Sequence, residues 1–226
     1  MSKQSDLLPE SLDRILDYVN PGDLVVLGSR PQNGKTRVAA GLIAAAKLRG
    51  NAQRHFFTLV EREETIRERI EIYLDEIDIS LSAVNINCSD NICAETIMNK
   101  LKGSNLQGAL IVIDYLQVLD ERRINPTLQN QLESLSLFAI ETGCIILFIA
   151  QLSRSVVDKP KVAPTENDIR LPNPLDLRLV NKLMFLYKLD ERQSGIDSHV
   201  TRLCIRKPHK HEFSLGSKQN VFDLEQ

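Results

Sequence analysis

The residues best suited to chemistry form a short loop between a predicted strand and a predicted helix. The loop is Gly28-SRPQNGKT-Thr36, and it directly follows the apolar run 24–27. Backbone N–H groups of such a loop, at a helix N-terminus, can surround phosphate oxygens. Lys35 would place its charge on the β- and γ-phosphates, Thr36 would offer a hydroxyl to Mg²⁺, and Gly34 lets the backbone pass close to the phosphates. The loop therefore predicts a nucleotide site.

The match to the phosphate-loop pattern G-x-x-x-x-G-K-[ST] is imperfect. Ser29 occupies the position of the first glycine, and Gly28 comes one residue too early. A chance G-K-T in an ordinary turn is the alternative, but the order of strand, loop and helix is the setting that phosphate binding needs. We therefore predict that the nucleotide is bound by Ser29, Arg30, Pro31, Gln32, Asn33, Gly34, Lys35, Thr36 and Arg37.

A second candidate is the carboxylate at the end of the apolar run 110–114. Asp114 lies near the carboxyl end of a predicted strand. A carboxylate there can hold the water shell of Mg²⁺ beside Thr36. A strand that ends in Asp is common and usually caps a turn, so only the pairing with the upstream phosphate loop favours a metal site formed by Thr36 and Asp114.

The elements that must position these residues alternate along the chain. Short, nearly unbroken apolar runs predict strands of a parallel sheet covered on both faces; they span residues 24–27, 55–60, 109–113, 144–150, 182–187 and 200–205. Helical patterns between them span Thr36–Arg49, Glu63–Ile77 and Thr127–Gly143, the first and last of which end at a glycine. The repeated unit of strand, helix and strand predicts an α/β fold.

Composition limits the function classes. With 226 residues, 42% of them hydrophobic, and a net charge of -2, the chain reads as one folded domain and not as a polycation that coats nucleic acid. The four cysteines show no C-x-x-C spacing, which indicates reduced thiols and disfavours a zinc site. The N-terminus has no signal-peptide pattern and the apolar runs are too short to span a membrane, so we expect a cytoplasmic protein.

Two irregular stretches interrupt the alternation. Residues 120–126 follow the third predicted strand, and residues 153–176, which include four prolines, follow the fourth. A loop of about twenty residues inside a compact domain is more often functional or disordered than a mere connector.

Several motifs together resemble the DnaB-type replicative helicases. The family has A-R-P-x-x-G-K-T, L-I-x-I-D-Y-L-Q-L, S-Q-L-N-R-S, S-D-L-R and L-I-M-F-I-Y-R segments, in that order. Their counterparts here are Arg30-PQNGKT-Thr36, Leu110-IVIDYLQVL-Leu119, Ala150-QLSRS-Ser155, Asn167-DIR-Arg170 and Leu183-MFLYK-Lys188. The family tolerates a small residue other than glycine at Ser29. KaiC and RadA relatives share this core, but the A-R-P-like loop together with I-D-Y-L-Q favours DnaB.

The resemblance covers about residues 8–222 and implies a RecA-like P-loop NTPase. The implied fold has three α/β/α layers with a mostly parallel twisted sheet and a late antiparallel hairpin. We expect a single domain over 1–226, with a helical lead-in at 1–20 and a core at 21–222. Relatives form hexameric rings, with ATP at subunit interfaces and single-stranded DNA in the channel. Because the chain begins almost at the core, we expect it to lack the family's N-terminal helical domain and linker helix.

The resemblance also implies catalytic roles, with two departures. Gln151 matches the family's γ-phosphate sensor. The glutamate that polarises the attacking water aligns with Val60, and we assign this role to Glu61, one residue later. Glu61 would face away from the nucleotide unless the strand ends or bulges first, and the alternative is an exposed charge at the start of the next helix. The Lys-x-Arg finger that relatives insert into the next subunit corresponds to Lys207 and His209, and an imidazole is a poor substitute for a guanidinium.

Five basic side chains of the irregular stretches match the family's channel-facing segments. The candidate DNA contacts are Arg122, Arg123, Arg154, Lys159 and Lys161. The alternative is a pair of solvated polar loops, since neither contains an aromatic residue for base stacking.

Taken together, the sequence predicts an ATP-hydrolysing, Mg²⁺-dependent helicase core for DNA replication or recombination. Such a core would form a ring, hexameric in the manner of its relatives, and would translocate on single-stranded DNA. The alternative from a different class is a hydrolysis-poor regulator or decoy that binds a replicative helicase or another partner.

Overall fold

The computed structural model describes most of the chain. It places residues 9–30, 33–48, 53–58, 61–74, 84–89, 92–120, 126–153, 164–169, 176–188, 201–207 and 211–215. None of the helices in these ranges is both long and apolar enough to cross a membrane.

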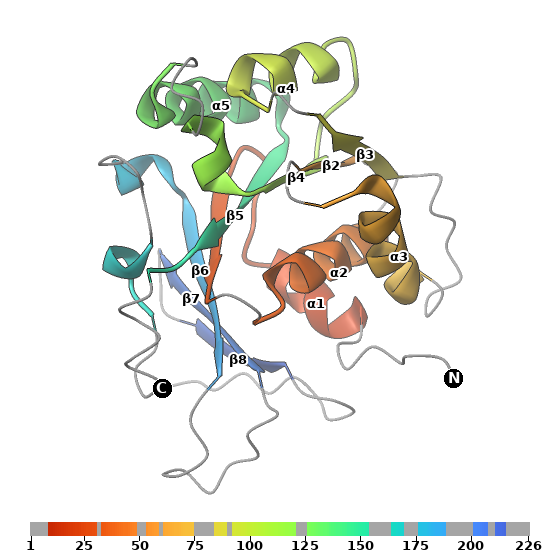
Figure 1. Ribbon diagram of the computed structural model, residues 1–226, viewed down its shortest axis with the longest axis vertical. Coiled ribbons are helices and arrows are strands. Elements are labelled where there is room, and N and C mark those ends of the chain that lie inside the picture. The colour runs from red at the N-terminus through yellow and green to blue at the C-terminus, as the bar shows by residue number, and fades with distance from the viewer. Residues whose placement is uncertain are drawn as a thin grey trace, which may run out of the picture.

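A single sheet runs through the centre of the described structure (Figure 1). Its eight strands are β1 (Leu24–Ser29), β2 (Arg54–Thr58), β3 (Val84–Cys88), β4 (Leu110–Asp114), β5 (Ile145–Gln151), β6 (Lys182–Lys188), β7 (Thr201–Lys207) and β8 (His211–Leu215). They lie in the order β3-β2-β4-β5-β1-β6-β7-β8. The first six are parallel, and β7 and β8 continue the sheet as antiparallel strands. The mostly parallel sheet and the late antiparallel hairpin are therefore both confirmed.

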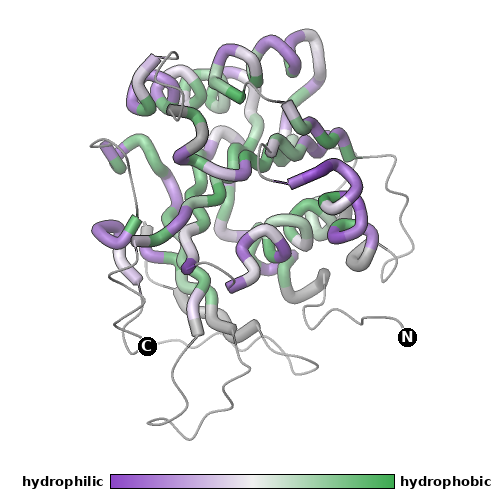
Figure 2. Tube along the Cα trace, in the orientation of Figure 1, coloured by the Kyte–Doolittle hydropathy of each residue, from purple (hydrophilic) through white to green (hydrophobic). Residues whose placement is uncertain are grey.

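Helices cover the two faces of the sheet as separate groups (Figure 1). One face packs against α1 (Pro9–Leu16), α2 (Lys35–Leu48) and α3 (Glu63–Leu74), and the other against α4 (Ala94–Leu101) and α5 (Leu128–Thr142). Strand residues alternate between the faces, so Val25 and Leu27 join the cluster of α2, whereas Leu24 and Val26 join that of α5. Figure 2 shows the resulting hydrophobic interior, with α3 mostly hydrophilic along its outer side.

The local sequence explains the ends of α5. Thr127 is its N-cap and accepts a hydrogen bond from Asn130 N through its side chain. Gly143 follows the last turn with φ +68°, and its N–H donates to Ala139 O. This left-handed cap is the conformation that the glycine at the end of the helical pattern predicts.

Two strands and one helix have no counterpart among the predicted apolar runs and helical patterns. In β3, the sequence V-N-I-N-C alternates between apolar and polar residues because the strand lies at the sheet edge, and only Val84 is buried. β8 is a short strand after a hydrophilic connection, and α4 has only eight residues. The predicted helix 63–77 is described to Leu74, and its last three residues lie outside the described ranges.

Gly28 allows close packing of β1 against neighbouring side chains. It belongs to the strand face that is opposite to α2, and a Cβ atom there would lie 2.9 Å from Cδ1 and Cε1 of Phe185 and 3.1 Å from Cδ2 of Leu152. Real Cβ contacts are almost never as short as 2.9 Å. The glycine one residue too early for the phosphate-loop pattern is therefore needed for the close approach of β1 to Phe185.

We predict that Gly28→Ala destabilises the fold by about 1–3 kcal/mol, because the fully buried Phe185 ring must shift to accept the methyl group. Urea unfolding followed by circular dichroism measures the change. An unaltered unfolding midpoint would show that the β1–β6 packing is looser than the contact distances indicate.

Candidate nucleotide and metal site

Four polar side chains lie at the carboxyl ends of the parallel strands. They share the face of the sheet that α2 covers, because each is an even number of residues from an apolar residue in the α2 cluster. These residues are Ser29 of β1, Thr58 of β2, Asp114 of β4 and Gln151 of β5. Parallel strands end at a common edge, so the four residues border one region beside the N-terminus of α2.

The phosphate loop leads from this edge into α2. Ser29 is fully buried, and its hydroxyl donates to Arg30 O at 2.8 Å. Gly34 has φ +81°, which only glycine adopts without strain, and no atom lies within 4 Å of the position of a Cβ there. Lys35 then begins the helix. Pro31 and Gln32 lie outside the described residues.

The first turn of α2 is electrostatically suited to an anion. The backbone N–H groups at its N-terminus carry the positive end of the helix dipole. The turn contains Lys35, Thr36 and Arg37 and no acidic residue, in contrast to α3, which has Glu63 and Glu64 in its first turn. No carboxylate of its own turn neutralises the N-terminus of α2.

Thr36 and Asp114 meet although 78 residues separate them. The Thr36 hydroxyl donates to Asp114 Oδ2 at 3.1 Å. Asp114 is only 3% exposed. Burial raises the pKa of its carboxyl group, while the hydrogen bond from Thr36 and the charge of Lys35 act in the opposite direction. The structure thus brings together the two residues that the sequence selected for Mg²⁺, and their hard oxygen atoms suit this ion.

Glu61 lies near this pair, in a position that strand alternation does not determine. β2 ends at Thr58, and the Glu61 N–H donates to Thr58 Oγ1 at 3.3 Å. The carboxylate of Glu61 forms an ion pair with Arg69 of α3, with 3.0 Å between Oε1 and Nη1. Both charges act on Asp114, since Glu61 raises and Arg69 lowers the pKa of that residue. Val60 lies outside the described residues.

Arg69 and Gln117 are two residues of this region that the sequence did not reveal. Arg69 is eight residues beyond Glu61 on a helix with many charges, so nothing in the pattern distinguishes it. Gln117 belongs to the I-D-Y-L-Q segment, and its side chain contacts the backbone of Gln151. The glutamine that ends the I-D-Y-L-Q string, three residues after Asp114, was the sequence signal that could have pointed to Gln117.

Arg30 connects the phosphate loop with the segment 164–169. Burial lowers the pKa of its guanidinium, and the charge of Asp168 opposes that effect. Asp168 is held in turn, because its carboxylate accepts hydrogen bonds from Thr165 N and Oγ1, and its carbonyl oxygen accepts one from Ser153 N. The segment around Asp168 and the start of the phosphate loop are therefore neighbours.

Several predicted site residues lie outside the described ranges. They are Arg122 and Arg123 of the first irregular stretch, Arg154, Lys159 and Lys161 of the second, and His209 of the finger. Lys207 is described only as the last backbone position of β7. These assignments remain predictions.

The strand order, with α2 beginning beside the carboxyl ends of β1 and β4, defines the class of RecA-like ATPase domains. A solved ATPase domain superposes with a TM-score of 0.71 over 96% of this chain and 91% of that domain, at 18% identity. The sequence model of the DnaB-like helicase C-terminal domain matches residues 77–214. The chain therefore belongs to the DnaB-like helicase C-terminal domain family.

Two curated relatives agree with this family. The replicative DNA helicase DnaB of Mycoplasma genitalium is 25% identical over 85% of this chain and 48% of its own length. The probable plasmid replicative DNA helicase of Chlamydia psittaci is 25% identical over 87% of this chain and 49% of its own length. The chain thus spans about half the length of the curated relatives it matches.

We predict that Asp114→Asn raises the thermal stability of the protein without ligand and abolishes Mg²⁺-dependent nucleotide binding. The substitution removes a buried charge at nearly constant volume, and such changes at functional sites commonly add about 1 kcal/mol of stability. Thermal unfolding at neutral pH in EDTA, and a nucleotide titration in Mg²⁺, measure the two effects. A less stable variant that binds nucleotide normally would contradict the assignment.

Proposed function

We propose that this chain is the ATP-hydrolysing core of a DnaB-like helicase that acts in DNA replication or recombination. The observation that carries the proposal is the hydrogen bond between Thr36 and Asp114 beside the N-terminus of α2. It joins, at the end of the β-sheet, a hydroxyl and a carboxylate of the kinds that P-loop ATPases use for a metal–nucleotide complex.

The residues fit ATP as substrate and Mg²⁺ as the accompanying ion. Thr36 and Asp114 would hold the ion, and Lys35 and the N–H groups of the loop would bind the phosphates. Bound there, Mg²⁺ would neutralise charge that develops on the phosphates during hydrolysis. Within the described ranges, no group of three or more His, Cys, Asp and Glu side chains could form a metal cage by itself. An ion held through substrate phosphates agrees with that arrangement.

Glu61 and Gln151 supply the groups for hydrolysis. Glu61 is the acidic side chain beside Asp114 that would orient the attacking water, and its ion pair with Arg69 keeps it in this region. Gln151 ends β5 next to Ser29 in the sheet and would contact the γ-phosphate. Both roles follow from the DnaB-type pattern and from the position of the two residues at the strand ends.

Work on DNA would require assembly. We propose a ring-forming homo-oligomer in the cytoplasm, a hexamer in the manner of the DnaB type. Arg122, Arg123, Arg154, Lys159 and Lys161 would contact the phosphates of single-stranded DNA, while Lys207 and His209 would approach the active site of the next subunit.

A second function has support in the sequence. His209 at the finger position favours slow hydrolysis, because an imidazole is a poor substitute for a guanidinium. A protein of that kind would act as a regulator or decoy that binds a replicative helicase through the shared fold.

ATP hydrolysis by the wild type, Lys35→Ala and Glu61→Gln, each with and without single-stranded DNA, tests the proposal. We expect Lys35→Ala to lose nucleotide binding and turnover. Glu61→Gln should retain binding but lose about 10²–10⁴-fold in turnover, because the amide cannot accept a proton from water. Glu64→Gln, which alters an exposed carboxylate in the first turn of α3, is the matched control and should behave as wild type.

Wild type and Lys35→Ala that are equally inactive, while wild type still binds nucleotide, would favour the regulator instead. Elution volume with and without ATP and Mg²⁺ provides an independent measurement. A persistent monomer without DNA-stimulated turnover would contradict the motor function.

A further inference from the structure

The carboxyl end of β5 extends beyond the end of the neighbouring strand β4. β4 pairs residues Leu110–Asp114 with Ile145–Ile149, so it stops two residues before Gln151. On the other side, β1 continues, and Ser29 pairs with Gln151. The last residue of β5 therefore has a neighbouring strand on the β1 side only.

A side chain takes the place of the missing strand. The carboxamide of Gln117 donates from Nε2 to Gln151 O at 3.1 Å and accepts from Gln151 N at 3.4 Å through Oε1. In a parallel sheet, the N–H and C=O of one residue point toward the same neighbouring strand. The next residue obeys this alternation, because Leu152 N donates to Ser29 O on the β1 side. Gln117 thus repeats the hydrogen-bond pattern of a strand at the position that β4 does not reach.

Buried leucines and hydrogen bonds hold the segment that carries Gln117. The residue belongs to the 3₁₀ helix η3 (Leu116–Asp120), in which Leu116 and Leu119 are fully buried. The carboxamide of Gln131 holds the end of this helix, since its Nε2 donates to Leu119 O at 2.6 Å and to Pro126 O at 2.8 Å. A carboxamide on such a base can fix the main chain that it contacts.

We propose that Gln117 is a positioning residue that fixes the backbone of Gln151 so that the Gln151 side chain can distinguish ATP from ADP. The inference rests on the proposed nucleotide site. The two hydrogen bonds from Gln117 engage the main chain of Gln151, so they leave its side chain available on the face of the sheet that α2 covers. Without them, Gln151 would keep a strand partner on the β1 side alone, and the orientation of its side chain would vary.

The contact between Gln117 and Gln151 joins the two segments that precede the irregular stretches. Gln117 lies three residues before the irregular stretch 120–126, and Gln151 lies two residues before the irregular stretch 153–176. A change at the γ-phosphate that moves Gln151 would therefore act on η3 directly.

Binding constants test this inference without any need for turnover. Calorimetry in Mg²⁺ would give the Kd of ADP and of a non-hydrolysable ATP analogue for the wild type, Gln117→Leu, Gln151→Ala and the double variant. We expect wild type to prefer the analogue, and Gln117→Leu to lose about fivefold or more of that preference with little change in the Kd of ADP. The double variant should lose no more of the preference for the analogue than Gln151→Ala alone, because both substitutions remove the same interaction with the γ-phosphate.

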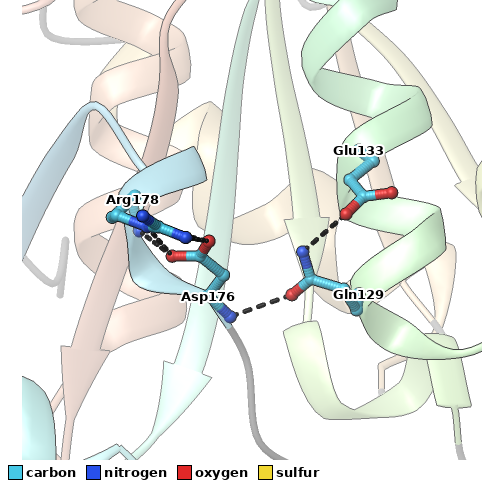
Figure 3. A network of polar contacts seen from close by, with 4 residues as sticks. All are labelled: Gln129, Glu133, Asp176 and Arg178. Atoms are coloured by element: carbon cyan, nitrogen blue, oxygen red, sulfur yellow. Dashed lines mark hydrogen bonds and ion pairs between the residues drawn. The ribbon is translucent and has the colours of Figure 1, made fainter.

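Gln129→Leu is the matched control. Its carboxamide also binds the main chain, since Gln129 Oε1 accepts from Asp176 N at 2.9 Å, but it lies on α5 within a network that includes Glu133 and Arg178 (Figure 3). α5 covers the face of the sheet opposite to α2. We expect this variant to retain the wild-type preference. Gln117→Glu is a second test in case Gln117→Leu does not fold, because its carboxylate would repel Gln151 O and should also reduce the preference.

The outcomes separate the two proposals. A preserved analogue preference in both Gln117 variants, or losses that add in the double variant, would overturn the role of Gln117. The same holds for a wild type that binds both nucleotides equally, although nucleotide binding itself would then stand. A wild type that binds neither nucleotide would overturn the proposed function.

Discussion

The position of the N-terminus of α2 beside the carboxyl ends of the parallel strands determines what the rest of the site can do. β5 lies between β1 and β4 in the sheet, so Thr36 must reach past one strand to meet Asp114. The crossing is possible because Gly34 turns the chain at φ +81° and because the apolar face of α2 packs on the sheet. The fold thereby holds a carboxylate at 3% exposure next to the positive end of a helix.

Charges around this carboxylate alternate in sign. Lys35 and Arg69 favour the ionised form of Asp114, whereas burial and Glu61 disfavour it. A buried carboxyl group whose pKa is raised in this way, beside charges of both signs, is typical of functional sites. The ion pair of Glu61 with Arg69 belongs to the same balance, since it keeps a second negative charge close to Asp114 without leaving it unpaired.

The sequence revealed the parts of this arrangement that depend on local patterns. Fully buried strands such as β1 and β5 appear as apolar runs, and the phosphate loop appears as a motif with its own strand and helix. Contacts between distant segments were not readable in the same way. The edge strand β3 buries little, so its pattern is weak, and the partner of Glu61 is one of the two arginines in α3. Gln117 forms the hydrogen bonds of a neighbouring strand because β4 ends two residues before the last residue of β5. Only the register of the sheet reveals this difference. The role of Gly28 required the position of Phe185, 157 residues later.

A crystal structure with Mn²⁺ and a non-hydrolysable ATP analogue would test the central claim most directly. The account predicts an anomalous peak from the metal beside Thr36 and Asp114, with the phosphates at the N-terminus of α2 and the side chain of Gln151 turned toward them. A nucleotide bound elsewhere, or a Thr36–Asp114 pair unchanged and without metal at saturating Mn²⁺ and analogue, would contradict it.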